Sequence, residues 1–205
     1  MNHTHYAHLP LPASLNPCID FHGHLCPGLV YGYLVAMESL RRLKEIRSDD
    51  EELVAISEND ACSVDALQVL LGTTAGKGNL TIQNIGKNVY TVYSRKAGKG
   101  FRFSRKNTYV YSGETPELFD DLEKKVTLGT ATVAEQKQQK ILKTLDLLTK
   151  PVDEVFAITD AAIPEPAFAE LAPSVACAAC GELTMKTKMV TRDDSLLCQP
   201  CASVE

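Results

Sequence analysis

Three side chains that bind transition metals lie within five positions near the start of the chain. They are His22, His24 and Cys26, in the segment Phe21-His-Gly-His-Leu-Cys-Pro-Gly28. In an extended segment, successive side chains alternate between two faces, so all three would project to one face. Imidazole and thiolate groups are ligands for metals such as zinc, iron and nickel. The octapeptide is therefore the first candidate functional centre. The alternative is a small buried cysteine beside two surface histidines.

Pro27 determines how Cys26 is presented. Proline holds the preceding residue in an extended conformation and suits the first position of a helix. The sequence therefore predicts a helix that starts at Pro27 with Cys26 as its N-cap. The positive end of the helix dipole favours a thiolate there, which is the form that binds a metal or attacks an electrophile. Cys26 and His22 are the candidate catalytic residues.

Four of the seven cysteines lie close to the end of the chain. Cys177 and Cys180 form one C-x2-C pair, and Cys198 and Cys201 form a second pair seventeen residues later. This spacing is typical of a structural zinc site with four cysteine ligands. About thirty residues bury too little apolar surface to fold alone, so metal binding would supply stability on the order of 10 kcal/mol. The sequence predicts a zinc finger here.

Cys62 repeats the environment predicted for Cys26, because it directly precedes a helix that is predicted to begin at Ser63. Two thiols at helix N-termini can converge if the helices pack side by side. With His22, and with His24 as the less secure ligand, they would form a mixed site that leaves a position open for water or substrate. The three cysteines outside the finger are too few for a four-cysteine iron–sulfur cluster, and no dinucleotide-binding motif is present.

Hydrophobic patterning predicts the elements that position these residues. The predicted helices span 27–46, 63–71 and 133–149, with another that opens at 115–117. The predicted strands span 53–56, 80–85, 89–94, 101–111 and 155–158, with hairpin turns at 86–88 and 97–100. This order predicts an α+β fold, with a mixed or antiparallel sheet and helices on one of its faces.

Composition divides the chain into three predicted parts. These are a core domain over 1–160, a linker rich in proline and alanine over 161–174, and the zinc finger over 175–205. The net charge of -5 gives no general reason to expect binding to nucleic acid or to membranes. No signal peptide and no apolar run of membrane-spanning length is visible, so we expect a cytoplasmic protein whose cysteines are metal ligands or free thiols.

A glycine-rich turn spans residues 72–79. It has the composition of a phosphate-binding loop, but it follows a helix and precedes a strand, which is the reverse of the context that such a loop needs. We predict instead that its backbone amides, Lys77 and Asn79 line the metal pocket and contact an anionic group of a small-molecule ligand. Asp65 has two interpretations: it orients a metal-bound histidine, or it stabilises the first turn of its own helix.

Basic residues cluster around the predicted hairpin at 97–100. Such a cluster binds phosphate or the acidic face of a partner, or it is a solvated edge that deters aggregation. The residues are Arg95, Lys96, Lys99, Arg102, Arg105 and Lys106.

Several segments resemble FmdE, the family of the E subunit of formylmethanofuran dehydrogenase. They are the octapeptide at 21–28, the segment Asp60-Ala-Cys-Ser-Val-Asp-Ala-Leu-Gln-Val-Leu70, the segment Gly76-Lys-Gly-Asn-Leu80 and the four-cysteine module that many members carry. The resemblance implies an α+β core of the type also seen in the catalytic domain of glyceraldehyde-phosphate dehydrogenase. It also implies a homodimer and a treble-clef-like zinc finger.

The same resemblance implies a metal site in the core. Its ligands would be His22, Cys26 and Cys62, with His24 and Asp20 as less certain neighbours. The metal would be zinc or another transition metal, and the finger would hold zinc. Only four residues follow Cys201, which leaves barely one turn for the last helix of the finger.

Two functions are compatible with these features. In the first, the core metal polarises a small ligand that bears a carbonyl or carboxyl group, or polarises a bound water. In the second, the chain is a non-catalytic accessory or regulatory protein, and its finger docks a protein partner rather than nucleic acid. The complex for which the family is named reduces carbon dioxide onto methanofuran with a molybdenum or tungsten pterin held in other subunits. Whether this chain is an enzyme is left open.

Overall fold

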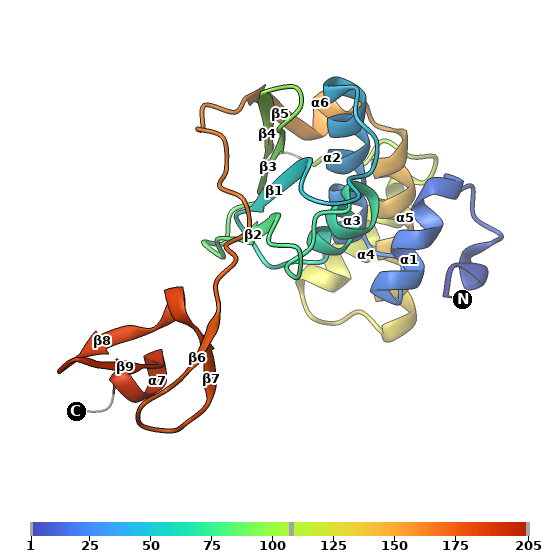
Figure 1. The fold of residues 1–205 in the computed structure, drawn as a ribbon. Helices are drawn as coiled ribbons and strands as arrows, with labels where there is room; N and C mark the ends of the chain where they lie inside the picture. Colours follow the sequence, from blue (N-terminus) through green and yellow to red (C-terminus); the bar gives the residue numbers. More distant parts are fainter. Residues whose placement is uncertain (1, 107–108, 204–205) are drawn as a thin grey trace. The chain divides into compact units, whose positions relative to one another are not determined.

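The computed structural model describes residues 2–106 and 109–203. The chain forms two units that are divided between residues 168 and 169, inside the segment predicted as a linker. Each unit is described by itself (Figure 1). No helix among the described residues is both long and apolar enough to cross a membrane.

The N-terminal unit consists of helices packed on one face of a mixed sheet, which confirms the predicted α+β class (Figure 1). Its α-helices are α1 (Asn16–His22), α2 (Pro27–Leu43), α3 (Ser63–Leu71), α4 (Pro116–Thr127), α5 (Val133–Thr149) and α6 (Val152–Val155). Short 3₁₀ helices span Asn2–Tyr6 and Ala13–Leu15. Its strands are β1 (Leu53–Ser57), β2 (Leu80–Ile82), β3 (Val89–Ser94), β4 (Lys99–Arg105) and β5 (Phe156–Asp160).

The sheet order is β2-β1-β3-β4-β5. Strand β2 runs parallel to β1, and the other neighbouring pairs are antiparallel. The predicted hairpin at 97–100 is confirmed, because it joins β3 to β4. The hairpin predicted at 86–88 is wrong, because β2 does not pair with β3. The backbone N–H groups of Ile85 and Lys87 donate to the carbonyl of Glu58 at the end of β1. The chain after β2 therefore passes the end of β1, and β3 pairs with the opposite edge of β1.

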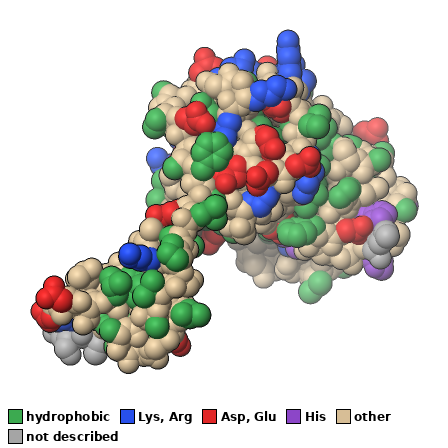
Figure 2. Space-filling model, in the orientation of Figure 1, with side chains coloured by type: hydrophobic (Ala, Val, Ile, Leu, Met, Phe, Trp, Pro, Cys, Tyr) green, Lys and Arg blue, Asp and Glu red, His purple; other side chains and the backbone are tan. Residues whose placement is uncertain are grey.

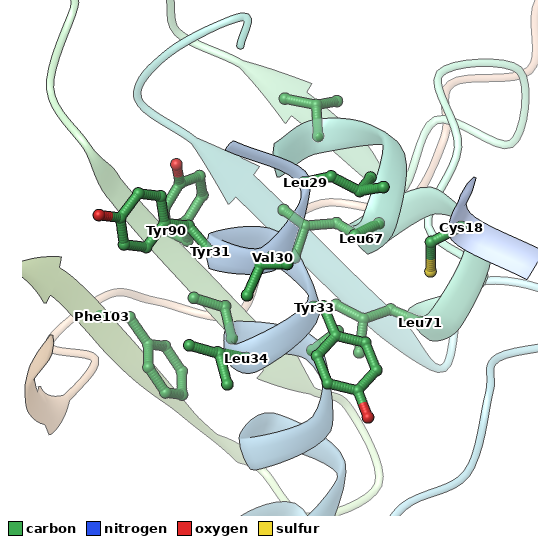
Figure 3. Close-up of a cluster of buried hydrophobic side chains, with 14 of the residues drawn as sticks. Cys18, Leu29, Val30, Tyr31, Tyr33, Leu34, Leu67, Leu71, Tyr90 and Phe103 are labelled. Carbon is green, nitrogen blue, oxygen red and sulfur yellow. The ribbon is translucent and has the colours of Figure 1, made fainter. Parts of the chain in front are cut away.

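Helix α2 lies at the centre of the hydrophobic core, between the sheet and α3 (Figure 3). Tyr90 and Phe103 lie on one side of α2, and Leu67 and Leu71 of α3 lie on the other. Tyr90 and Phe103 are neighbours because the antiparallel register of β3 and β4 pairs them directly. A helix between two layers must be apolar around most of its circumference, and α2 has ten buried residues.

Two glycines of α2 allow the start of α3 to pack against its backbone. A Cβ atom at Gly32 would lie 2.1 Å from the carbonyl oxygen of Ser63. A Cβ atom at Gly28, one turn earlier, would lie 3.0 Å from the Cβ of Cys62. Any larger residue at position 32 would therefore push α3 away from α2, and with it Cys62.

The C-terminal unit contains two short hairpins, a 3₁₀ turn over Lys186–Lys188 and a short α-helix. Its strands are β6 (Ser174–Ala176), β7 (Leu183–Met185), β8 (Val190–Arg192) and β9 (Ser195–Leu197), followed by α7 (Gln199–Ala202). Leu183 at the start of β7 and Val190 at the start of β8 are 76% and 41% exposed. The buried side chains are those of Cys177 and Cys198. The cysteine cluster therefore takes the place of a hydrophobic core.

Charged side chains are mixed on the face shown in Figure 2, where acidic and basic groups of the N-terminal unit lie side by side. Ion pairs in the N-terminal unit include Arg95 with Glu51 and Arg102 with Glu58. Among the described residues, two of the six basic residues around the hairpin at 97–100 are thus paired with carboxylates.

The variant Gly32→Ala tests whether the approach of α3 to α2 depends on this glycine. Its new methyl group would collide with the backbone of Ser63, so we expect a loss of about 3 kcal/mol in the free energy of unfolding. Urea unfolding followed by circular dichroism measures this loss. The control is Gly76→Ala, because no described atom lies within 4 Å of a Cβ there, and its effect should stay within about 0.5 kcal/mol. Equal stability of both variants would contradict the packing described here.

Candidate functional site

A sharp turn brings the two histidines and the cysteine of the octapeptide together. The ligand atoms of His22, His24 and Cys26 all lie within 4.8 Å of one another. The segment is not extended as predicted, because His22 is the last residue of α1 and Gly23 reverses the chain in the left-handed conformation, at φ 92°. Pro17 near the start of α1 and Gly23 at its end were the signals for this helix.

Cys26 is the N-cap of α2, as predicted, and its sulfur accepts a hydrogen bond from the N–H of Leu29. Cys62 is the N-cap of α3. A Cβ atom at Gly28 would lie 3.4 Å from the sulfur of Cys62 and 3.8 Å from that of Cys26. The two thiols therefore face the same small space at the N-termini of two packed helices, but the Cys62 sulfur is not one of the three ligand atoms that lie within 4.8 Å of one another.

His22 is held in place by a carboxylate from α3. Its Nδ1 lies 2.7 Å from Oδ2 of Asp65, and its Nε2 lies 3.7 Å from the sulfur of Cys26. This is the arrangement in which a carboxylate fixes the tautomer and orientation of a metal-binding histidine. Of the two interpretations of Asp65, the geometry favours the orienting one.

His24 lies at the exposed side of the cluster, with its ring centroid 4.5 Å from that of His22. Partial burial, the neighbouring His22 and the charge of Lys140 lower the pKa of His24. A lowered pKa keeps the imidazole neutral, which is the form that binds a metal.

Burial, with a smaller contribution from the nearby Cys62, raises the pKa of the Cys26 thiol to about 11. The N–H of Leu29 lowers it, but less than burial raises it. The predicted stabilisation of a thiolate by the helix N-terminus is therefore outweighed by burial at Cys26. A bound cation would reverse this balance, because thiolates are the metal-binding form.

Cys18 and Asp20, both in α1, lie outside the cluster. Cys18 faces the core near Leu67 and Leu71, and burial raises its pKa to about 11 (Figure 3). Asp20 was a candidate neighbour of the metal, but its carboxylate binds the backbone N–H and Nδ1 of His3. It therefore anchors the N-terminal 3₁₀ helix.

Lys77 and Asn79 do not contact the metal cluster. The ammonium group of Lys77 donates to the carbonyls of Asp49 and Asp50, and the buried amide of Asn79 donates to those of Asp50 and Leu53. Both side chains are used to fix the loop before β1. Lys77 and Asn79 follow the C-terminal end of α3. This end lies about 13 Å along the helix from Cys62 at its N-terminus.

The four C-terminal cysteines form a second cluster, with their sulfurs all within 4.8 Å of one another. Backbone N–H groups of Cys180, Cys198 and Ala179 lower the pKa of Cys177 to about 6. The sulfurs of Cys198 and Cys180 raise the pKa of Cys201 to about 12. Four thiolates this close repel one another unless a cation binds them, so this donor set fits a closed metal site.

An open cleft of about 310 Å³ adjoins the core cluster at the N-termini of α2 and α3. Gly28 lines it and also touches the space between the two core thiols. Sequence reasoning missed this cleft, because its walls come from segments far apart in the chain: α2, α3, β3, β4 and α5. Its polar wall residues include Tyr31, Ser63, Tyr90, Arg105, Lys140 and Lys143.

Comparison with known proteins supports this description. The family model described as "FmdE, Molybdenum formylmethanofuran dehydrogenase operon" matches residues 21–157, which include every residue of the core cluster. The chain belongs to the FmdE family. A crystal structure of an FmdE-like protein from Syntrophus aciditrophicus, described as similar to the E subunit of a tungsten formylmethanofuran dehydrogenase, has the same fold. Its TM-score is 0.59 at 19% identity, and the match covers 92% of this chain and 90% of that one.

A longer relative also matches this FmdE-family chain. It is a protein of Archaeoglobus fulgidus named "Probable S-adenosyl-L-methionine-binding protein", which is 31% identical over 193 residues. The match covers 89% of this chain but 50% of the relative, so the chain spans about half the length of that protein.

We expect Asp65→Asn to lower the affinity of the core for metal by about 10- to 100-fold, because the amide no longer fixes His22 as a ligand. Zinc affinity measured against a competing chelator tests this. Asp20→Asn is the matched control, because it breaks a His–carboxylate pair of equal length outside the cluster. A similar loss of affinity in both variants would contradict the role given to Asp65.

Metal binding by the core should strengthen as pH rises. The Cys26 thiol has a pKa of about 11, so it is protonated at neutral pH and must release its proton to bind. The affinity should therefore rise at least about tenfold per pH unit between about pH 6 and about pH 9. Calorimetry in two buffers counts the released protons. A slope below one proton would show that Cys26 is not a ligand.

Proposed function

We propose that the core of this FmdE-family protein holds a transition metal, with zinc as the first choice, on His22, Cys26 and Cys62. His24 lies at the exposed side of the cluster and either completes the site or borders it. The observation that carries the proposal is the Asp65–His22–Cys26 arrangement, in which Nε2 of His22 is aimed at the Cys26 sulfur beside an open cleft.

The donor set fits a metal for a physical reason. A buried thiol and an imidazole held by a carboxylate form a poor hydrophobic core but a good set of ligands for zinc. A bound metal would supply Lewis acidity toward a carbonyl or carboxyl oxygen of a small ligand. The protein itself orients His22 through Asp65 and leaves the cleft beside Gly28 open to that ligand.

S-adenosyl-L-methionine is one carboxylate-bearing ligand to test, because the Archaeoglobus fulgidus relative is named for binding it. The proposal includes a cytoplasmic location and a homodimer, the latter because the family resemblance implies it. The finger would hold a second, structural zinc ion on Cys177, Cys180, Cys198 and Cys201.

A non-catalytic role as an accessory protein is the second candidate. Leu171 and Leu183 of the C-terminal unit are 95% and 76% exposed, which suits a surface that docks a protein partner. Coordination separates the two functions. Three protein ligands plus solvent at the core favour chemistry, and four protein ligands favour structure or sensing.

Metal analysis tests the proposed centre. The wild-type chain should bind two zinc equivalents, and the double variant Cys26→Ala Cys62→Ala should lose one of them. The variant Cys177→Ala Cys201→Ala should lose the other. X-ray absorption on this second variant would then report the ligands of the core metal alone. Retention of both equivalents after loss of Cys26 and Cys62 would refute the core site.

A further inference from the structure

One polar group at the wall of the cleft has no partner. The side chain of Tyr31 is 7% exposed, and its hydroxyl makes no hydrogen bond with any residue that the structure describes. Tyr90, beside it at the edge of the core, differs: its hydroxyl lies 2.7 Å from Oγ of Ser63, so each satisfies the other (Figure 3). A buried hydroxyl without a partner is unfavourable, so the Tyr31 hydroxyl is a candidate donor to a ligand.

The cleft carries a concentrated positive charge. Arg105, Lys140 and Lys143 line it, and no carboxylate of the described residues does. The guanidinium carbon of Arg105 lies 4.5 Å from the centroid of the Tyr31 ring. Within the described part of the chain, this guanidinium group has no ion pair or hydrogen bond, whereas Arg102 of the same strand pairs with Glu58. The ammonium nitrogen of Lys143 lies 4.0 Å from a carboxylate oxygen of Glu123, which makes a long ion pair.

The helix N-termini add to this potential. The cleft opens at the starts of α2 and α3, where Pro27, Gly28, Ala61 and Ser63 line it. Backbone N–H groups at a helix start carry partial positive charge and favour anions. Here they coincide with three cations and an unpartnered buried hydroxyl, which are independent signs of the same preference.

The geometry points to an oxyanion subsite: the cleft binds the carboxylate or phosphate group of the small ligand that the core metal holds, through Arg105, Lys140 and the Tyr31 hydroxyl. This inference rests on the proposed function for its ligand, because Gly28 joins the cleft to the two core thiols. Arginine suits this role because its planar fork of N–H donors matches the two oxygens of a carboxylate or phosphate.

A purely structural role for these residues predicts something different. If Arg105 and Tyr31 only stack on each other, removing the Tyr31 hydroxyl has no effect on anion binding. If the hydroxyl donates to an anion, Tyr31→Phe weakens binding. In both cases we expect Tyr31→Phe to leave the stability of the fold unchanged, because the hydroxyl has no partner among the described residues.

Calorimetric titration of the zinc-loaded full chain with acetate, and separately with phosphate, tests the subsite at fixed ionic strength. The variant Arg105→Gln Lys140→Gln should bind the preferred anion at least about tenfold more weakly. The control Lys96→Gln Lys137→Gln removes the same charge from exposed positions that do not line the cleft, and it should stay within about twofold. Tyr31→Phe should weaken binding by about threefold or more without lowering the unfolding midpoint.

The two anions distinguish a carboxylate ligand from a phosphate ligand. The subsite is overturned if neither anion binds the wild-type protein below about 100 mM, or if the control weakens binding as much as the cleft variant. It is also overturned if Tyr31→Phe binds as tightly as wild type. Repeating the titration on Cys26→Ala Cys62→Ala separates the two proposals. Anion binding that still depends on Arg105 supports the subsite even where metal analysis has refuted the core site.

Discussion

The close approach of α3 to the backbone of α2 is the constraint on which the rest of the site depends. Gly28 and Gly32, one turn apart, leave room for Cys62 and for the backbone of Ser63. This contact places two helix N-termini together, so two N-cap cysteines face one space. It also opens the cleft beside them. The proposed metal ligands, the proposed anion donors and the core packing thus share one helix crossing, and a single methyl group at position 32 would disturb all three.

Two opposing effects act on the thiols at this crossing. Helix N-termini favour a thiolate, but burial of Cys26 favours the neutral thiol, and burial is the larger effect. A cation bound at the proposed site would favour the thiolate form of Cys26. The same surroundings, with three cations in the adjoining cleft, disfavour a second cation and favour an anionic ligand. The proposed metal site and the proposed anion subsite are in this way electrostatically complementary.

Local sequence signals predicted the bounds of several helices. They did not predict contacts between segments that lie far apart in the chain. Pro27 and Gly72 marked the start of α2 and the end of α3, and both predictions are confirmed. Strand β2 was assigned the wrong partner, because a short apolar run does not specify which neighbour it pairs with. Lys77 was misassigned for a related reason: nearby carbonyls satisfy its ammonium group, and a sequence does not show this. Arg105 lines the cleft beside the core cluster because segments far apart in the chain pack together.

Anomalous diffraction at the zinc edge, on crystals of the full chain, tests the central claim most directly. The C-terminal cysteine cluster serves as an internal reference, because its metal should appear in the same map. We predict a second peak bounded by Nε2 of His22 and the sulfurs of Cys26 and Cys62, with metal–sulfur distances of about 2.3 Å. A map with a peak at the finger but none between α2 and α3 would contradict a metal centre in the core.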